Sequence, residues 1–233
     1  MLNSVGLQNP GAEAFLQEEL PFLKTLDTVI IANIVGNTIG DYCQTAWKLN
    51  VDGIDMFELN ISCPNVKTGM SFGVKPESVL EVTREVKRFC KKPLIVKLTP
   101  NVADIRENAK AAEEGGADAV SLINTLAAMA VDVKTFKPVL GNVTGGLSGP
   151  AVKPVAVRMV YECAKAVRIP VIGTGGITCG EDVAEFIIAG AAAVQVGTAN
   201  ISDPFAMPKI IGQFKNYLTE VGISDINLLR GKL

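Results

Sequence analysis

The chain contains no histidine among its 233 residues. This absence excludes every mechanism that needs an imidazole base, such as a Ser-His-Asp triad or a Cys-His pair, and it excludes zinc sites with histidine ligands. Proton transfer in any reaction that this chain catalyses must therefore be carried out by Cys, Lys, Tyr, Asp or Glu side chains.

Metal-binding cysteine pairs, blocks of basic residues and membrane-length apolar runs are also missing. The five cysteines form no Cys-x-x-Cys pair, so we predict no metal site, and their irregular spacing is typical of a reducing, cytoplasmic compartment. A net charge of −2 without a Lys/Arg cluster predicts no nucleic-acid partner. The longest apolar stretches, such as 29–34 and 187–194, fall far short of the roughly 20 residues that span a bilayer, and no signal peptide is recognised.

The chain does contain a regular alternation of short β-branched runs and longer amphipathic segments. Its length and 48% hydrophobic content suit one large domain over residues 1–233. Strands are predicted for 28–34, 54–60, 94–98, 118–123, 170–174 and 193–197, and helices for 11–20, 38–50, 76–91, 102–115, 151–167, 180–189 and 204–217. Short strands that are each followed by a helix predict an α/β fold with a parallel sheet covered on both faces.

Two glycine-rich segments near the end of the chain favour a (β/α)8 TIM barrel over an open sheet. Residues 173–177 (Gly-Thr-Gly-Gly-Ile) follow one predicted strand, and residues 197–200 follow the next. In such barrels the loops after strands 7 and 8 form a phosphate site. Counting backward labels the other four strands 3 to 6, so we expect a barrel that is truncated at its N-terminus, with strands 1 and 2 missing.

A long connection without a predicted helix joins residues 123 and 150. Such connections are unusual in compact domains and are most often functional. Residues 130–133 and 138–140 are predicted to pair as a small hairpin, which would lie over the catalytic face of the barrel.

The strongest catalytic signal is Cys63, which stands in the string Asn-Ile-Ser-Cys-Pro-Asn (60–65), directly after an apolar run. A buried strand delivers this thiol into a loop, and Pro64 prevents further strand pairing. A thiol with a pKa of about 8.5 is a usable base when its surroundings favour the thiolate. The alternative is an inert, buried small side chain. We favour that alternative for the cysteines in or beside predicted helices, namely Cys43, Cys90, Cys163 and Cys179.

Lys97 is the second unusual residue, because it lies in the otherwise apolar predicted strand 94–98. A lysine that points into a barrel interior is costly unless it is paired with an acceptor. The alternative is a lysine at the strand rim that reaches solvent.

Eight strings in order along the chain resemble class 1 dihydroorotate dehydrogenase, most closely the type B catalytic subunit. They are 3–11 (N-S-V-G-L-Q-N-P-G), 32–36, 60–67 (N-I-S-C-P-N-V-K), 96–101, 123–125, 145–156, 172–177 and 196–199. The resemblance implies an FMN enzyme of de novo pyrimidine biosynthesis that oxidises (S)-dihydroorotate to orotate. Cys63 would be the general base at C5, and the C6 hydride would go to flavin N5.

The resemblance also implies which residues contact cofactor and substrate. Lys97 would stabilise the charge that develops on the reduced flavin. The implied cofactor-binding residues are Asn33, Asn60, Lys97, Ile123, Gly149, Gly175, Gly176, Gly197 and Thr198. The implied substrate-binding residues are Asn3, Ser4, Val5, Gly6, Leu7, Asn60, Asn124 and Thr125. Amide side chains suit a pyrimidinedione because they offer both donor and acceptor, although a single asparagine can equally be a turn residue.

In type B enzymes electrons leave FMN for a separate subunit that carries FAD and a [2Fe–2S] cluster, and then reach NAD. The resemblance therefore implies a homodimer that assembles with this electron-transfer subunit into a heterotetramer in the cytoplasm. Three alternatives remain open: a fumarate-linked type A enzyme, a flavin domain like that of dihydropyrimidine dehydrogenase, and a catalytically inactive truncated remnant.

Overall fold

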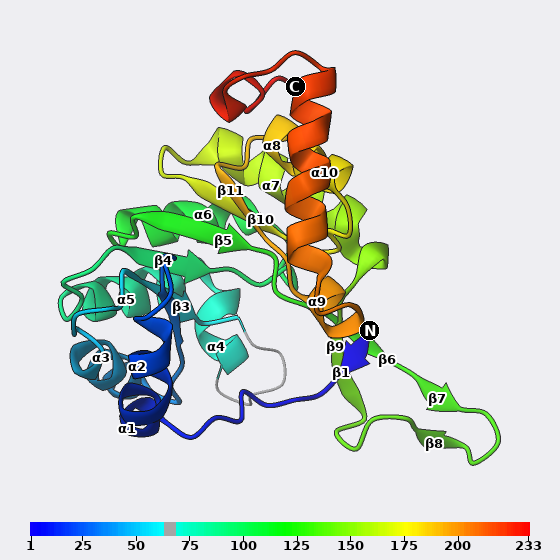
Figure 1. Cartoon of the computed structure of the whole chain (residues 1–233). Coiled ribbons are helices and arrows are strands. Elements are labelled where there is room, and N and C mark those ends of the chain that lie inside the picture. Colours follow the sequence, from blue (N-terminus) through cyan, green and yellow to red (C-terminus); the bar gives the residue numbers. More distant parts are fainter. Residues whose placement is uncertain (63–68) are drawn as a thin grey trace.

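The computed structural model describes residues 1–62 and 69–233, so Cys63 lies outside the described residues. Its centre is a curled parallel sheet with the strand order β11-β10-β5-β4-β3-β2 (Figure 1). The strands are β2 (Ile31–Ile34), β3 (Met56–Asn60), β4 (Leu94–Lys97), β5 (Ala119–Leu122), β10 (Val171–Thr174) and β11 (Ala193–Gln195). Each lies within one of the predicted strand ranges, and every neighbouring pair is parallel, as the sequence predicts.

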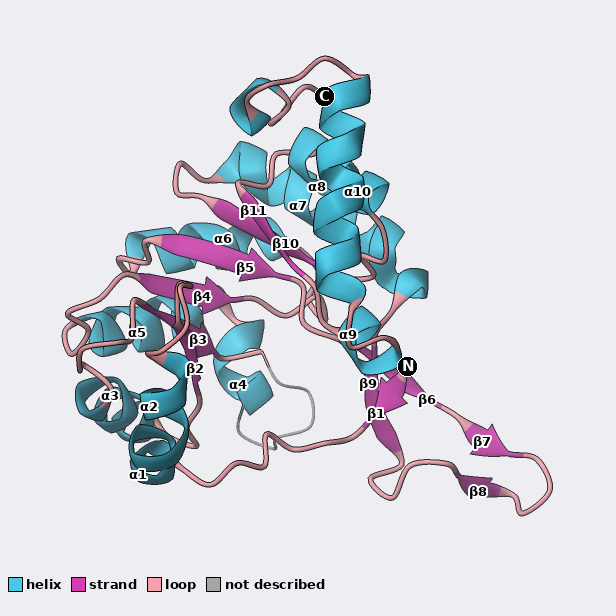
Figure 2. Ribbon diagram, viewed as in Figure 1, coloured by secondary structure: helices cyan, strands magenta, loops and turns pink. Residues whose placement is uncertain are grey.

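Helices cover the outer face of this sheet (Figure 2). The long ones are α3 (Ile39–Lys48), α5 (Pro76–Lys87), α6 (Ile105–Glu114), α7 (Lys153–Ala166), α8 (Gly180–Ile188) and α10 (Ala206–Glu220). The short ones are α1 (Ala12–Ala14), a π-helical turn Phe15–Glu19, α2 (Leu20–Leu23), α4 (Gly69–Val74), α9 (Thr198–Ser202) and 3-10 turns at Pro150–Val152 and Ile226–Leu228. The sequence predicts all of the long helices but neither α4 nor α9.

Local sequence signals explain where the helices begin. Helix α3 starts at a capping box, in which the Thr38 hydroxyl accepts from the Asp41 amide at 3.1 Å and the Asp41 carboxylate accepts from the Thr38 amide at 2.9 Å. Asp104 is the N-cap residue of α6, and its side chain accepts a hydrogen bond from the Arg106 amide.

Side chains on the central strands divide between two environments because they alternate along a strand. On β3, Phe57 and Leu59 are fully buried in the hydrophobic core, while Glu58 and Asn60 belong to a buried polar network. The sequence therefore builds an apolar outer layer against the helices and a polar interior on the concave side of the sheet.

The described sheet is curled but not closed, and its six strands agree with the truncated barrel that the sequence predicts. Within residues 1–62 and 69–233 the sheet has six strands, and β2 and β11 form its two edges. An apolar groove of about 480 Å³ runs along β2 beside Phe15 and Leu23. Ile31 on β2 is 42% exposed, and Phe205, which follows α9, is 69% exposed.

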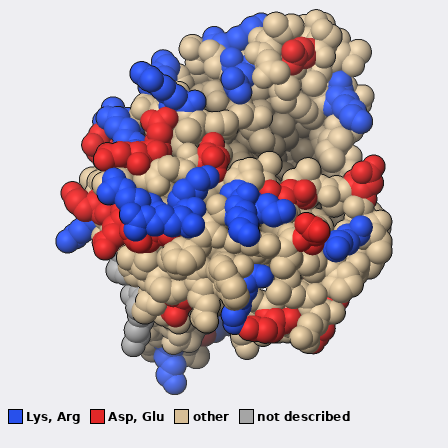
Figure 3. All heavy atoms as spheres, turned by 90° about the vertical axis from the view of Figure 1, so that its left-hand side faces the viewer, with Lys and Arg blue, Asp and Glu red and all other residues tan. Residues whose placement is uncertain are grey.

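Charged side chains are distributed over the outside of the molecule. Figure 3 shows basic and acidic groups mixed together on one face, and a hollow that is walled mainly by uncharged residues. Within the part of the chain that the structure describes, no helix is both long and apolar enough to cross a membrane.

The N-terminus belongs to a small antiparallel sheet, β1-β9-β6, formed by β1 (Leu2–Asn3), β9 (Thr144–Leu147) and β6 (Leu126–Met129). None of the predicted strands includes residues 1–10, yet Leu2 and Asn3 form β1. Close approach requires glycine on β9: a Cβ at Gly145 would lie 2.3 Å from the Asn3 carbonyl oxygen. This packing places Asn3 beside the carboxyl ends of the central strands.

The predicted hairpin in the long connection is confirmed. Strands β7 (Val131–Asp132) and β8 (Lys137–Pro138) pair antiparallel, with Val131 opposite Pro138. The hairpin projects away from the central sheet (Figure 1), so it does not cover the catalytic face as expected.

Candidate functional site

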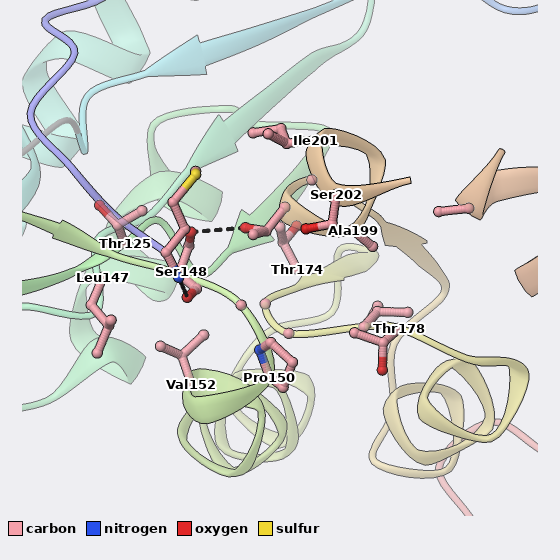
Figure 4. A pocket seen from close by; sticks show the side chains of 18 of the residues that line it. Thr125, Leu147, Ser148, Pro150, Val152, Thr174, Thr178, Ala199, Ile201 and Ser202 are labelled. Carbon is pink, nitrogen blue, oxygen red and sulfur yellow. Dashed lines mark hydrogen bonds between the residues drawn. The ribbon is translucent and has the colours of Figure 1, made fainter. Parts of the chain in front are cut away.

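A cavity of about 540 Å³ opens at the carboxyl ends of β4, β5, β10 and β11. Its walls come from the loops that follow these strands, from β1 and from the segment after β9 (Figure 4). Ten of the residues that the sequence singles out line it together: Asn3, Lys97, Ile123, Asn124, Thr125, Gly149, Gly175, Gly176, Gly197 and Thr198. Parallel strands bring these residues together because their carboxyl ends meet at one edge of the sheet.

Three glycine loops form one side of this cavity. Gly176 has a φ of 77°, and a Cβ there would lie 2.8 Å from the Gly149 carbonyl oxygen, so the loops after β9 and β10 touch. A Cβ at Gly197 would meet no atom within 4 Å, which leaves open space beside the backbone. The Thr198 hydroxyl donates to the Ser148 hydroxyl at 2.8 Å and joins α9 to the loop after β9 (Figure 4).

Lys97 is paired, as a lysine in an apolar strand must be. Its Nζ lies 3.4 Å from Oε2 of Glu58, and its side chain is 18% exposed. Glu58 is 5% exposed and also accepts hydrogen bonds from Ser121 at 2.7 Å, Gln195 at 2.8 Å and Asn33 at 2.5 Å. Burial alone would raise the pKa of Glu58, but the charge of Lys97 and these three hydrogen bonds together lower it below its ordinary value.

The sequence reasoning missed Glu58, Ser121 and Gln195. One signal could have found Glu58: it stands in an apolar strand, two positions before Asn60, and therefore on the same side of β3. Ser121 and Gln195 carry no comparable local signal, since ordinary strands contain many serines and glutamines.

A chain of hydrogen bonds between polar side chains continues from the Glu58 carboxylate. Asn60 donates to the Asn33 side chain at 3.3 Å, and the Ser62 hydroxyl donates to the Asn60 side chain at 3.0 Å. Asn124 donates to the Ser62 hydroxyl at 2.9 Å, and Tyr42 donates to the Asn60 carbonyl oxygen at 3.0 Å. The network fixes the end of β3 immediately before Cys63, and neither Asn33 nor Asn60 lines the main cavity.

Other predicted site residues take different places. Ser4, Val5, Gly6 and Leu7 do not line the cavity that Asn3 lines, and Val5 is 65% exposed. Asn101, which is not among the predicted site residues, donates to the Thr125 carbonyl oxygen at 3.0 Å and accepts from the Ala127 amide at 2.9 Å. It therefore fixes the loop that carries Asn124 and Thr125.

Three of the described cysteines have the properties of structural residues. Burial raises the pKa of the thiols of Cys90 and Cys163 to about 12, and burial also raises that of Cys43. These three thiols stay protonated at neutral pH, which agrees with the inert reading for them. Among residues 1–62 and 69–233, no group of three or more His, Cys, Asp or Glu side chains could hold a metal ion.

A parallel, curled βα sheet with its cavity at the carboxyl ends of the strands defines a protein of the (β/α)-barrel class. Among solved structures with a similar fold, DHODH in complex with ferulenol from Eimeria tenella matches with a TM-score of 0.82. The match covers 99% of this chain and 70% of that chain at 22% sequence identity.

The sequence comparisons identify the family. The family model for dihydroorotate dehydrogenase matches residues 1–218. The catalytic subunit of dihydroorotate dehydrogenase B (NAD(+)) from Alkaliphilus oremlandii is 57% identical over 100% of this chain and 78% of its own length. Its counterpart from Thermoanaerobacter pseudethanolicus is 56% identical over the same shares. The chain therefore belongs to the dihydroorotate dehydrogenase family of oxidoreductases, and it spans 78% of the length of these relatives.

Proposed function

We propose that this chain is the catalytic subunit of an NAD-linked, type B dihydroorotate dehydrogenase, with residues 1–233 forming one FMN-binding domain. The observation that carries the proposal is the convergence of ten expected residues on a single cavity, in a chain whose relatives are named for this activity. The product would be orotate for de novo pyrimidine synthesis in the cytoplasm.

The size of the cavity and the chemistry of its walls support the binding of FMN. Its volume of about 540 Å³ lies within the usual range for ligand pockets. Gly175, Gly176 and Gly197 expose backbone at one side of the cavity, where Lys209 also lines the wall, and such loops suit a phosphate. Lys97 lines the cavity, and it would supply a cation to the flavin ring. When bound, FMN would supply a hydride acceptor.

The residues of the chain would bind the substrate and move one proton. Asn3, Asn124 and Thr125 line the cavity, and we propose that their amides and hydroxyl hydrogen-bond the pyrimidine ring and its carboxylate. We propose that the Cys63 thiolate removes the proton from C5 of dihydroorotate. Cys63 lies outside the described residues, and its support is the strand β3 that precedes it and the polar network that fixes Asn60 and Ser62.

For the electron path we propose a separate partner subunit that carries FAD and a [2Fe–2S] cluster and reduces NAD, within a heterotetramer built on a homodimer. The name of the relatives, catalytic subunit of an NAD(+) enzyme, supports a division of labour between subunits. Dihydroorotate-driven NADH formation is expected only after the partner is added. NADH formation by this chain alone would exclude the separate electron-transfer subunit.

A second candidate is a protein of this family without catalytic turnover. The open edges of the six-stranded sheet favour it, because barrel closure normally removes such edges. The visible absorption spectrum of the protein distinguishes the two candidates when it is recorded under anaerobic conditions before and after addition of dihydroorotate. A bound-flavin spectrum that bleaches is expected for the enzyme, whereas a colourless protein that FMN cannot reconstitute would overturn the proposed activity.

A further inference from the structure

One buried carboxylate contacts both open edges of the sheet. Oε1 of Glu58 accepts from Ser121 on β5 at 2.7 Å and from Gln195 on β11 at 2.8 Å. Oε2 accepts from Asn33 on β2 at 2.5 Å and lies 3.4 Å from Nζ of Lys97 on β4. Together with β3, which carries Glu58, five of the six described strands meet at this group.

The two edge strands can reach the same carboxylate because the sheet is curved. β2 and β11 stand at opposite ends of the strand order, and in a flat sheet of six strands they would lie roughly 24 Å apart. Here they both donate to a single side chain. A carboxylate has about four acceptor positions, so the four contacts to Glu58 use its capacity fully.

The donors are themselves held in one orientation. The Gln195 side-chain oxygen accepts from the Thr174 hydroxyl at 2.9 Å, which leaves the Gln195 amide nitrogen to face Glu58. The Asn33 side-chain oxygen accepts from Asn60 at 3.3 Å, which leaves its nitrogen to face Glu58 as well. The network therefore requires an acceptor at both oxygens of residue 58, and a glutamine there would turn an NH2 group toward a donor.

We propose that Glu58 is a positioning residue that ties the two open edges of the sheet together and holds the ammonium group of Lys97 at the cavity. The role of Glu58 in linking the two edge strands does not depend on the cofactor. Its role in the effect of Lys97 on a flavin rests on the proposed function.

The first test uses the protein without cofactor and follows backbone amide exchange in Glu58→Gln. Amides of β2 and β11 are expected to exchange about tenfold faster together, because both edges lose the same charged acceptor. The matched control is Glu113→Gln, which removes a carboxylate that accepts from the amides of Arg168 and Ile169 away from the two edges. Faster exchange at only one edge, or at neither, would overturn the proposal.

A second variant keeps this test decisive if Glu58→Gln does not fold. Gln195→Met removes one donor on β11 and leaves the carboxylate in place. Exchange is expected to accelerate on β2 as well as on β11, since the two edges share the acceptor. A change confined to β11 would show that the edges are not coupled through Glu58.

The third test measures the reduction potential of bound FMN. Glu58→Gln is expected to raise the potential, because the positive charge of Lys97 then stabilises reduced flavin without a balancing carboxylate. In a Lys97→Met background the same substitution is expected to have little effect. An equal shift of the potential in both backgrounds would show that Glu58 does not act on the flavin through Lys97. Failure of the wild-type protein to bind FMN would instead overturn the proposed function and leave the exchange tests valid.

Discussion

The middle and the edges of the central sheet are stabilised in different ways. Strands β3, β4 and β5 are almost entirely buried and are held by apolar packing on the helix side. Edge strands β2 and β11 keep partly exposed residues and donate from Asn33 and Gln195 to Glu58 in the interior. In this half-barrel the hydrophobic core fixes the middle strands, and a buried carboxylate helps to hold the edges at barrel curvature.

The largest effect is expected at the end of the middle strand β3. Cys63→Ala should leave FMN bound while the rate of flavin reduction by dihydroorotate falls about 10²–10⁴-fold, because this substitution removes the proposed general base. Stopped-flow absorbance measures this rate. Cys90→Ala is the control, and since its thiol is held protonated it should leave the rate unchanged. An undiminished rate in the Cys63 variant would remove this residue from the mechanism.

Packing in the middle of the sheet can be compared directly with packing at its edge. Leu94→Ala on β4 removes a fully buried side chain and should lower the free energy of unfolding by about 2–5 kcal/mol. Ile31→Ala on β2 removes a side chain of the same size that is 42% exposed, so its cost should be clearly smaller. Urea unfolding measures both values. Equal losses would contradict the distinction between middle and edge.

Acid should weaken the polar contacts of the edges. The pKa of Glu58 is lowered in the folded protein from its ordinary value of 4.5, so its contribution to stability is present above that value. This contribution is lost as the pH falls through the lower, folded pKa. The free energy of unfolding of the wild type should therefore decline more steeply below pH 4.5 than that of Glu58→Gln. Parallel pH profiles for the two proteins would contradict this assignment.

The smallest effect is expected from the exposed side of the edge strand. Within the described part of the chain, β2 is an edge strand that lies next to an apolar groove. Exposed sheet edges promote self-association, so we expect concentration-dependent association of the purified protein. Ile31→Lys should reduce it, as sedimentation velocity can show. Val133→Lys is the control, because Val133 is 78% exposed on the β7–β8 hairpin, away from both edges. A larger reduction by the hairpin substitution would place the contact there instead.

Sequence periodicity predicts the central strands well, because buried parallel strands read as short β-branched runs between helices. It fails for β1, since a strand of two residues has no period and forms only because Gly145 lets the N-terminal segment approach. It also fails for α9 (Thr198–Ser202), which has only five residues and follows Gly197 directly. Whether such a short segment forms a strand or a helix depends on the residues that pack against it.

The candidate site was predictable where its residues follow strand ends. The sequence places Lys97 near the end of one predicted strand and Asn124, Gly175 and Thr198 after three others, and topology then brings them to one cavity. The partners of Glu58 were not predictable in this way. Ser121 and Gln195 are 63 and 137 residues away along the chain, and no local pattern links them to a carboxylate on β3.

The sequence by itself determined the class of fold, the family, and the set of residues at the strand ends, because these depend on local periodicity and on motifs read in order. Only the tertiary structure decided that Lys97 is paired with Glu58 and that both edges of the sheet donate to this carboxylate. The reason is physical: hydrogen bonds and ion pairs across the interior depend on how the sheet curls, and curvature arises from all of its strands together.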